Sequence, residues 1–358
     1  MQKHFILVAI SIAFLISCQK ESNNNVDNYI ESGSALIVNE GGYTRNNGSI
    51  SYISRDNQVV NNIFEKSNNG QIVGDVLQSF TRVGNIGIIC ANNSQKVIFV
   101  DARTFKQLET LTTGTDYPRF SLGVTTDKAY ITNGSSSGTV LVVNMKTFTV
   151  TKTINVGDGP EEMLLSNGKV FVANSGGFGT DNTISVINTA TDAVVSSIIV
   201  ADNPGEMEKD AQGYLWVLCK GNVTYPAPTY APERQSAAKL VRINPSTNTI
   251  DRQIEIIPAS ADYSAADNLA VSGDGSKIFV CIDDKVYQLP YTATALPATP
   301  VITRLFYGLD IHPFTGEIWG LDAGNFNEAG KIIRYNSNAQ AVDSFKVGII
   351  PNAVYFNL

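Results

Sequence analysis

Few residues in this sequence could carry out acid–base or nucleophilic chemistry. Of its two histidines, His4 lies in an apolar amino-terminal segment and His312 lies in the segment DIHPFTGE. A single histidine cannot form a His-rich metal site, and neighbouring Pro and Gly are typical of a turn. Neither an HExxH motif nor a phosphate-binding glycine loop occurs. The sequence therefore favours binding over catalysis, and we predict no catalytic residue, no resident cofactor and no metal site.

The cysteines offer little more chemistry. Cys90, Cys219 and Cys281 each lie within an apolar, strand-like run, and Cys18 lies near the amino terminus. The three internal cysteines are an odd number, so they cannot all pair with one another. We predict that they are buried free thiols.

Candidate ligand-binding side chains collect in polar segments between the apolar runs. Aromatic rings there are mixed with amides, carboxylates and guanidinium groups, a combination that suits a large, polar and partly flat ligand. The segment 219–237 is the longest of them and contains three prolines, which stiffen an exposed loop. The predicted ligand-binding residues are Tyr43, Arg45, Asn46, Tyr117, Arg119, Phe178, Glu206, Tyr225, Tyr230, Arg234, Tyr263, Asn325 and Phe326.

The apolar runs that must position these segments form a repeat. Each repeat unit contains four short β-branched runs separated by Gly, Asn, Asp and Thr, and most units span about 40 to 50 residues, the period of a propeller blade. The second run of each unit can be followed along the whole chain as ALIVNE, GIICAN, AYITNG, VFVANS, LWVLCK, IFVCID and IWGLDA. Seven occurrences predict an all-β, seven-bladed β-propeller with few helices.

The two ends of the repeat predict how the ring closes. The first unit begins at Ala35 with its second run, whereas the chain finishes with VGIIPNAVYFNL, which resembles a leading run. We therefore expect residues 351–358 to complete the first blade, which pairs an otherwise open sheet edge. In such a ring the loops after each second strand share one rim with the links between blades. The candidate binding residues lie in these segments, and loops on a rigid scaffold are where binding usually occurs.

The amino terminus has the features of a lipoprotein signal peptide. Residues 1–17 combine Lys3 with an apolar segment too short to span a bilayer, and they end in Leu15-Ile16-Ser17 before Cys18. We predict lipidation of Cys18, a flexible tether over residues 18–34 and the propeller over residues 35–358. An outer-membrane lipoprotein at the cell surface is the expected location. The net charge of −7 argues against nucleic acid as a partner.

The runs YITN (from Tyr130) and FVAN (from Phe171), followed by VLVVNMKT and ISVINTAT, resemble the YVTN repeat of YncE-like propellers. The opening ALIVNEGGYTRNNGSISYIS, close behind the lipidation motif, resembles the cobalamin-binding BtuG-type surface lipoproteins of Gram-negative gut bacteria. This resemblance implies capture of a cobalamin-like corrinoid and its transfer to a TonB-dependent outer-membrane transporter. It does not by itself specify a ligand.

Three functions are consistent with these features. The first is a surface protein that binds a corrinoid, whose ring is fringed with amides. The second is a scaffold that binds a glycan or a protein through the same rim. The third is an enzyme, such as a propeller lyase or a quinone-dependent dehydrogenase; related lyases use a His/Glu pair with magnesium, a placement that this sequence lacks.

Overall fold

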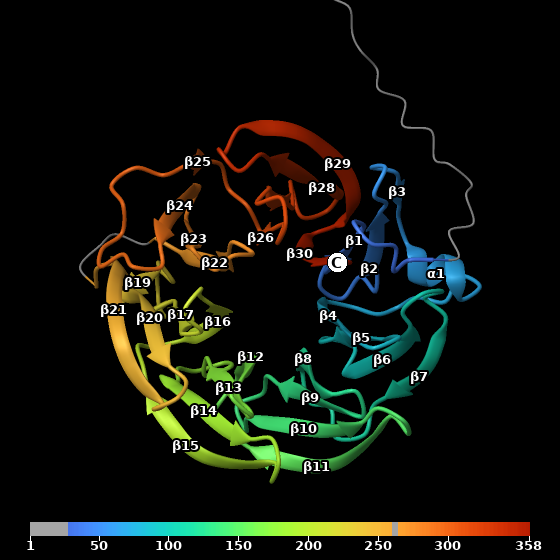
Figure 1. Ribbon diagram of the computed structural model, residues 1–358, viewed down its shortest axis with the longest axis horizontal. Coiled ribbons are helices and arrows are strands. Elements are labelled where there is room, and N and C mark those ends of the chain that lie inside the picture. Colours follow the sequence, from blue (N-terminus) through green and yellow to red (C-terminus); the bar gives the residue numbers. More distant parts are fainter. Residues whose placement is uncertain (1–27, 260–263) are drawn as a thin grey trace, which may run out of the picture.

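The computed structural model describes residues 28–259 and 264–358, and it forms seven four-stranded antiparallel sheets around a central channel (Figure 1). The predicted seven-bladed β-propeller is therefore confirmed. From the channel outward, blade 1 consists of β30 (Pro351–Phe356), β1 (Ala35–Asn39), β2 (Ser49–Ile53) and β3 (Val59–Val60). Blade 2 consists of β4 (Leu77–Val83), β5 (Ile86–Ala91), β6 (Lys96–Asp101) and β7 (Gln107–Leu111). Blade 3 consists of β8 (Pro118–Thr125), β9 (Lys128–Asn133), β10 (Thr139–Asn144) and β11 (Thr149–Asn155).

The remaining four blades repeat this pattern. Blade 4 consists of β12 (Pro160–Ser166), β13 (Lys169–Asn174), β14 (Thr183–Asn188) and β15 (Ala193–Ile199). Blade 5 consists of β16 (Pro204–Lys209), β17 (Leu215–Cys219), β20 (Ala238–Asn244) and β21 (Thr249–Ile257). Blade 6 consists of β22 (Ala266–Val271), β23 (Lys277–Ile282), β24 (Lys285–Pro290) and β25 (Ile302–Thr303). Blade 7 consists of β26 (Gly308–Ile311), β27 (Ile318–Asp322), β28 (Ala329–Tyr335) and β29 (Ala341–Ile349).

The carboxyl-terminal strand closes the ring as predicted. Strand β30 pairs with β1, so that Ala35 lies opposite Phe356. Beyond the strand, the buried Asn357 side chain donates hydrogen bonds to the carbonyl oxygen of Tyr29 and to Ser34 Oγ, both at 2.9 Å. These contacts hold the first and last strands together and complete the first blade as a four-stranded sheet.

The packed domain begins earlier than the expected boundary at residue 35. The Tyr29 side chain is buried, and its ring packs edge-on against Tyr52 and Phe105. The end of the predicted tether therefore belongs to the fold. Burial of the aromatic ring stabilises this segment by more than the conformational entropy that the short polar segment loses when it becomes ordered. The predicted signal peptide, Cys18 and most of the predicted tether lie outside the described residues.

The hydrophobic core lies between neighbouring blades. In β13, Val170 to Asn174 are all buried, because each face of the strand is covered by an adjacent sheet. Apolar side chains of β13 and β14 pack against those of β17 and β20, with Phe171 and Val217 in one cluster. The outermost strands, such as β15, are much more exposed. This explains why the second runs of the repeat are so apolar.

The structure places His312 and the three internal cysteines as the sequence predicts. His312 lies in the turn between β26 and β27, where Nδ1 accepts hydrogen bonds from the backbone N–H groups of Phe314 and Thr315, both at 3.2 Å. The three internal cysteines are buried and unpaired. Burial raises the pKa of the Cys90 thiol to about 11, so it is protonated and unreactive at neutral pH.

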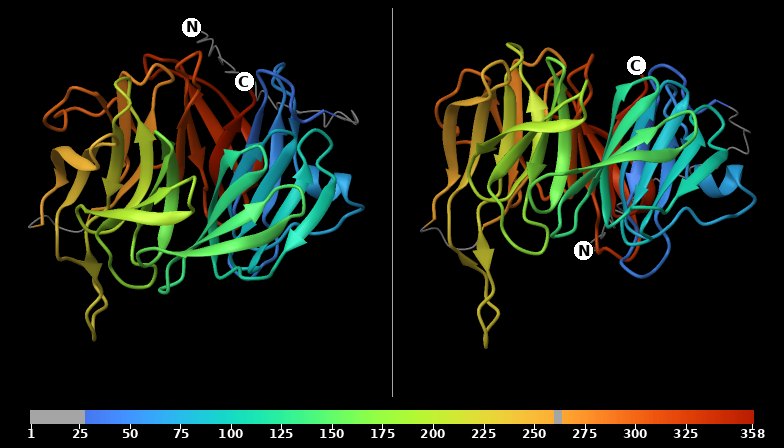
Figure 2. Two further views of the ribbon diagram at one scale, coloured as in Figure 1. Left: turned by 60° about the horizontal axis from the view of Figure 1, so that its bottom comes forward. Right: turned by 90° about the horizontal axis from the view of Figure 1, so that it is seen from below.

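Two features depart from the regular blades. A short hairpin formed by β18 (Val223–Thr224) and β19 (Glu233–Arg234) stands out from the disc, drawn in olive-yellow in Figure 2. The helix α1 (Ile63–Ser67) packs against β2 at the outer edge of blade 1. Within the described residues, no helix has the length and apolar character needed to cross a membrane.

Candidate ligand-binding cavity

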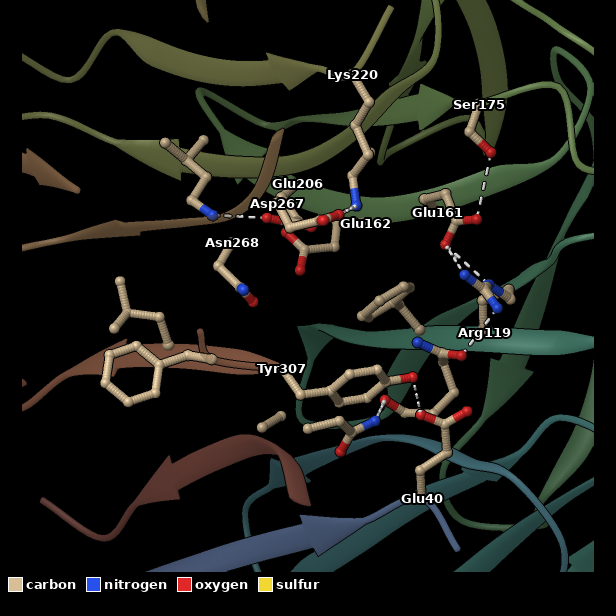
Figure 3. Close-up of a pocket in the computed structure, with 18 of the residues that line it drawn as sticks. Glu40, Arg119, Glu161, Glu162, Ser175, Glu206, Lys220, Asp267, Asn268 and Tyr307 are labelled. Carbon is tan, nitrogen blue, oxygen red and sulfur yellow. Dashed lines mark hydrogen bonds and ion pairs between the residues drawn. The ribbon is translucent and has the colours of Figure 1, made fainter. Parts of the chain in front are cut away.

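A cavity of about 670 Å³ occupies one end of the central channel. All seven blades contribute to its wall, mainly through the first residues of the innermost strands and the loops that follow the second strands (Figure 3). This is the loop-rich face on which the sequence places the candidate binding residues. The volume is in the range of cavities that hold small-molecule ligands.

Local irregularities in the inner strands direct side chains into this cavity. The pairing of β12 with β13 shifts register between Pro160 and Met163, and β16 shows the same shift between Pro204 and Met207. A bulge of this kind leaves residues of the inner strand without a partner and turns successive side chains toward the same side. As a result, both Glu161 and Glu162 reach the cavity.

The cavity wall is strongly acidic. Arg119 and Lys220 are the basic residues that line it. The lining carboxylates, which come from five blades, are Glu40, Glu161, Glu162, Glu206, Glu208, Asp267, Asp310 and Asp322. Such a wall favours ligands that are cationic or that donate many hydrogen bonds.

Two ion pairs bridge adjacent blades near the mouth. Arg119 Nη2 lies 2.7 Å from Glu161 Oε2, which joins blade 3 to blade 4. Lys220 Nζ lies 2.7 Å from Asp267 Oδ1 and 3.1 Å from Glu206 Oε1, which joins blade 5 to blade 6. Burial alone would lower the pKa of Lys220, but these two carboxylates outweigh burial and raise it.

A second group of carboxylates accepts hydrogen bonds from the backbone of the next blade. Glu162 Oε2 accepts from the N–H of Met207 at 2.9 Å, and Glu206 Oε2 accepts from the N–H of Leu269 at 2.6 Å. Asp310 accepts in the same way from the N–H of Val354 at 2.8 Å. The bonds fix these carboxylates to the channel wall and hold neighbouring inner strands together.

Proton affinities are raised at the deep end of the cavity. Burial, followed by repulsion from Glu206, raises the pKa of Glu162 well above its usual range. Burial together with Asp310 raises the pKa of Glu208 to about 8, and burial raises the pKa of Asp310 to about 7. At neutral pH these groups therefore share protons instead of being fully ionised.

Aromatic rings border the mouth. The Tyr307 hydroxyl donates a hydrogen bond to Glu40 Oε2 at 2.6 Å (Figure 3). The Tyr307 ring also meets the Phe326 ring edge-on, with ring centroids 5.5 Å apart. On the other side, Tyr117 makes an edge-on contact with Phe178, whose side chain is 81% exposed. These rings offer apolar surface next to the acidic wall.

The predicted binding residues divide into three groups. Those that line the cavity are Arg119, Glu206 and Phe326. Those in neighbouring segments of the same face, outside the lining, are Tyr43, Arg45, Asn46, Tyr117, Phe178 and Asn325. Those on the projecting hairpin are Tyr225, Tyr230 and Arg234. Tyr263 lies outside the described residues.

The hairpin residues have two different roles in the structure. Tyr225 and Tyr230 are 55% and 67% exposed, and neither lines the cavity. Arg234 instead fixes the base of the hairpin, because its guanidinium group donates hydrogen bonds to the carbonyl oxygens of Lys220, Ser236 and Ser264. A side chain with this many backbone contacts positions the loop rather than reaching toward the cavity.

Several lining residues are absent from the sequence prediction, notably Lys220, Glu208, Asp310 and Tyr307. One signal could have found part of this set. When the blades are aligned on the start of the inner strand, Glu162, Glu206 and Asp310 occupy the same position of the repeat. A carboxylate that recurs at one repeat position must lie at one level of the channel.

The described residues contain little catalytic machinery at the cavity. No histidine or cysteine lines it, and among the described residues no group of three His, Cys, Asp or Glu side chains is arranged to hold a metal ion. The letters GSSSG at residues 134–138 match the hydrolase pattern G-x-S-x-G. They lie between strands β9 and β10, whereas that pattern requires a strand-to-helix turn.

Solved structures with the same fold include proteins of different kinds. The chain is similar to a quinonprotein alcohol dehydrogenase-like protein from Bacteroides thetaiotaomicron VPI-5482, with a TM-score of 0.67 and 12% identity over 92% of this chain and 79% of that chain. It is similar to the periplasmic gluconolactonase of Pseudomonas aeruginosa, with a TM-score of 0.65 and 12% identity over 90% and 99% of the two chains. It is also similar to Kuenenia stuttgartiensis hydrazine synthase, with a TM-score of 0.55 and 20% identity over 75% and 80%. At these identities the similarity shows the fold alone.

The sequence itself gives a family but no function. No curated protein matches this chain. The family model described as a domain of unknown function, DUF5074, matches residues 33–348. Because this match covers most of the sequence, the chain belongs to the DUF5074 family.

Proposed function

We propose that this protein is a binding protein without enzymatic activity, and that its ligand donates hydrogen bonds to the acidic cavity. The observation that carries this proposal is a cavity of about 670 Å³ with eight lining carboxylates and two basic side chains. Buried carboxylates gain most from partners that supply N–H or O–H groups. Tyr307 and Phe326 add an apolar surface on which part of the ligand can lie.

The finer proposal is that the ligand is a cobalamin-like corrinoid. Its peripheral carboxamides donate hydrogen bonds, and its ring offers a face to aromatic side chains. A corrinoid is too large for the cavity to enclose it, so its ring would lie over the mouth while amides reach the carboxylates. In this proposal the protein is an outer-membrane lipoprotein at the cell surface and passes the corrinoid to a TonB-dependent transporter.

Calorimetric titration of the purified protein with cyanocobalamin tests the corrinoid proposal. Tyr307→Ala with Phe326→Ala should weaken binding by about 1–3 kcal/mol, since two aromatic contacts are lost. Tyr225→Ala with Tyr230→Ala is the matched control, because those rings are exposed but lie outside the cavity. Absence of binding at micromolar cyanocobalamin would refute the corrinoid as ligand.

The location is tested separately. Radiolabelled palmitate should be incorporated into the protein in cells, and Cys18→Ala should abolish that labelling. Protease added to intact cells should degrade the protein if it lies on the outer surface. Protection of a correctly folded protein from the protease would contradict surface exposure.

A protein or glycan partner is the second candidate, and the projecting hairpin is the observation that favours it. Two exposed tyrosines on a proline-containing segment, held at its base by Arg234, resemble the aromatic anchors of protein interfaces. This candidate predicts that the control variant with both hairpin tyrosines replaced retains small-molecule binding but loses a co-purifying partner.

The absence of enzymatic activity is also testable. A quinone-dependent enzyme would show visible absorbance after purification, and a metal-dependent lyase would contain stoichiometric metal. Either finding in the full-length protein would contradict our proposal, and absence of both would support it.

A further inference from the structure

The central channel contains a second cavity, of about 280 Å³, on the side opposite the first. It lies beside the turn that contains Pro313 and the end of β30, and the ends of the inner strands form much of its wall. Glu208 and Asp310 line both cavities. The two cavities therefore meet at these carboxylates, which form an acidic section within the channel.

The carboxylates of this section lack the cationic partners found near the mouth. Glu161 is paired with Arg119, and Asp267 is paired with Lys220. Among the ion pairs of the described residues, none involves Glu208 or Asp310. The pKa of Glu208 is raised to about 8 and the pKa of Asp310 to about 7. Burial is the main cause of both shifts, and the proximity of Asp310 adds to the shift of Glu208.

The wall of the second cavity is largely apolar. Its side chains belong to the inner strands of blades 6, 7 and 1 and to the residues that follow them, namely Ala270, Val271, Ile311, Pro313, Val354, Tyr355, Phe356 and Leu358. A hydrated inorganic ion would gain little from such a wall, because hard cations require several oxygen ligands. An alkyl chain would gain from it by removing apolar surface from water.

We propose that the acidic section of the channel binds a small organic ammonium ion, with its nitrogen between Glu208 and Asp310 and its alkyl chain against the apolar wall. The ligand class is a short aliphatic amine or diamine, which fits a cavity of about 280 Å³. Glu208 and Asp310 also line the first cavity, but they lie in the channel away from the mouth, where the proposed corrinoid ring would lie. The inference therefore stands or falls independently of the proposed function.

Titration of the purified protein with putrescine, at fixed ionic strength and neutral pH, tests the inference. We expect saturable binding with one molecule per chain, and we expect no binding of butanediol, which has the same length without charge. Glu208→Gln with Asp310→Asn should weaken putrescine binding by about tenfold or more, since two charge-assisted hydrogen bonds are lost. Glu233→Gln is the matched control, because it removes an exposed carboxylate from the hairpin, outside both cavities.

The possible results separate cleanly. No putrescine binding at millimolar concentration, equal binding of butanediol, or equal binding by the double variant would each overturn the inference. Displacement of putrescine by an equimolar amount of magnesium or calcium would also overturn it, in favour of an inorganic ion. If the double variant does not fold, as judged by loss of its unfolding transition, the single variant Glu208→Gln serves in its place and should weaken binding in the same direction.

Discussion

Replacement of Glu208 by glutamine should stabilise the protein, and more so as the pH rises. In the folded protein, burial and the proximity of Asp310 raise the pKa of Glu208 to about 8 from an ordinary value of 4.5. The folded state thus binds the proton more tightly than the unfolded state. The stability that this group contributes is fully present below about pH 4.5 and is lost as the pH rises through about 8.

The size of the effect follows from the difference in proton affinity. Each tenfold change in proton affinity is worth about 1.4 kcal/mol of free energy. A pKa raised from 4.5 to about 8 therefore corresponds to a change of at most about 5 kcal/mol in the free energy of unfolding. The Glu208 side chain retains partial contact with solvent in the channel, which screens its charge. We therefore expect the gain in the free energy of unfolding above pH 8 to be about 1–3 kcal/mol.

Urea unfolding of the wild-type protein and of Glu208→Gln at about pH 5 and about pH 9 measures this difference. The two proteins should have similar stability at the lower pH and diverge at the higher one. Glu233→Gln, which removes an exposed carboxylate, should leave the difference between the two pH values unchanged. If Glu208→Gln is equally or less stable than the wild type at the higher pH, the raised pKa of Glu208 and its assignment to burial and the proximity of Asp310 are wrong.

Three further predictions concern the scaffold. Asp210→Ala should lower the free energy of unfolding by about 3–5 kcal/mol, since it removes the buried carboxylate that lies 2.7 Å from Arg242 Nε and leaves the buried guanidinium group with only the partly exposed carboxylate of Asp251. Urea unfolding measures this loss, and a change below about 1 kcal/mol would contradict it. Asn357→Ala removes two buried hydrogen bonds at the ring closure and should lower the free energy of unfolding by about 1–3 kcal/mol in the same assay. A loss no larger than that of the exposed control Asn338→Ala would contradict this role of Asn357. In the Cys18→Ala variant, a thiol reagent should label the protein only after unfolding, and rapid labelling of the native variant would contradict the burial of Cys90, Cys219 and Cys281.

Much of the architecture could be predicted because each blade is encoded locally. A buried run such as that of β13 has the same pattern in every repeat, since every second strand is covered on both faces by neighbouring blades. The incomplete first unit and the extra final run, now β30, indicated the closure directly. The predicted start of the packed domain was late, because Tyr29 is a single aromatic residue within a polar segment and has no repeat pattern to identify it.

The binding residues were harder to predict from local sequence. Long loops with exposed aromatic residues drew attention to Tyr225 and Tyr230, but their hairpin projects from the disc (Figure 2) and neither residue lines the cavity. Glu208 and Asp310 lie within inner strands and look like ordinary strand residues in the sequence. Their importance depends on burial and mutual repulsion, which are properties of the assembled ring.

The sequence by itself therefore determined the number of blades, the closing strand and the face that carries the longer loops, because each of these depends on patterns repeated along the chain. Only the tertiary structure decided which side chains meet in the channel. Residues as distant as Glu40 and Tyr307 come within hydrogen-bonding distance because ring closure places blades 1 and 7 side by side. Likewise, a register shift in inner strand β12 brings both Glu161 and Glu162 to the acidic wall of the cavity. No residue type in the sequence predicts the position of such a shift.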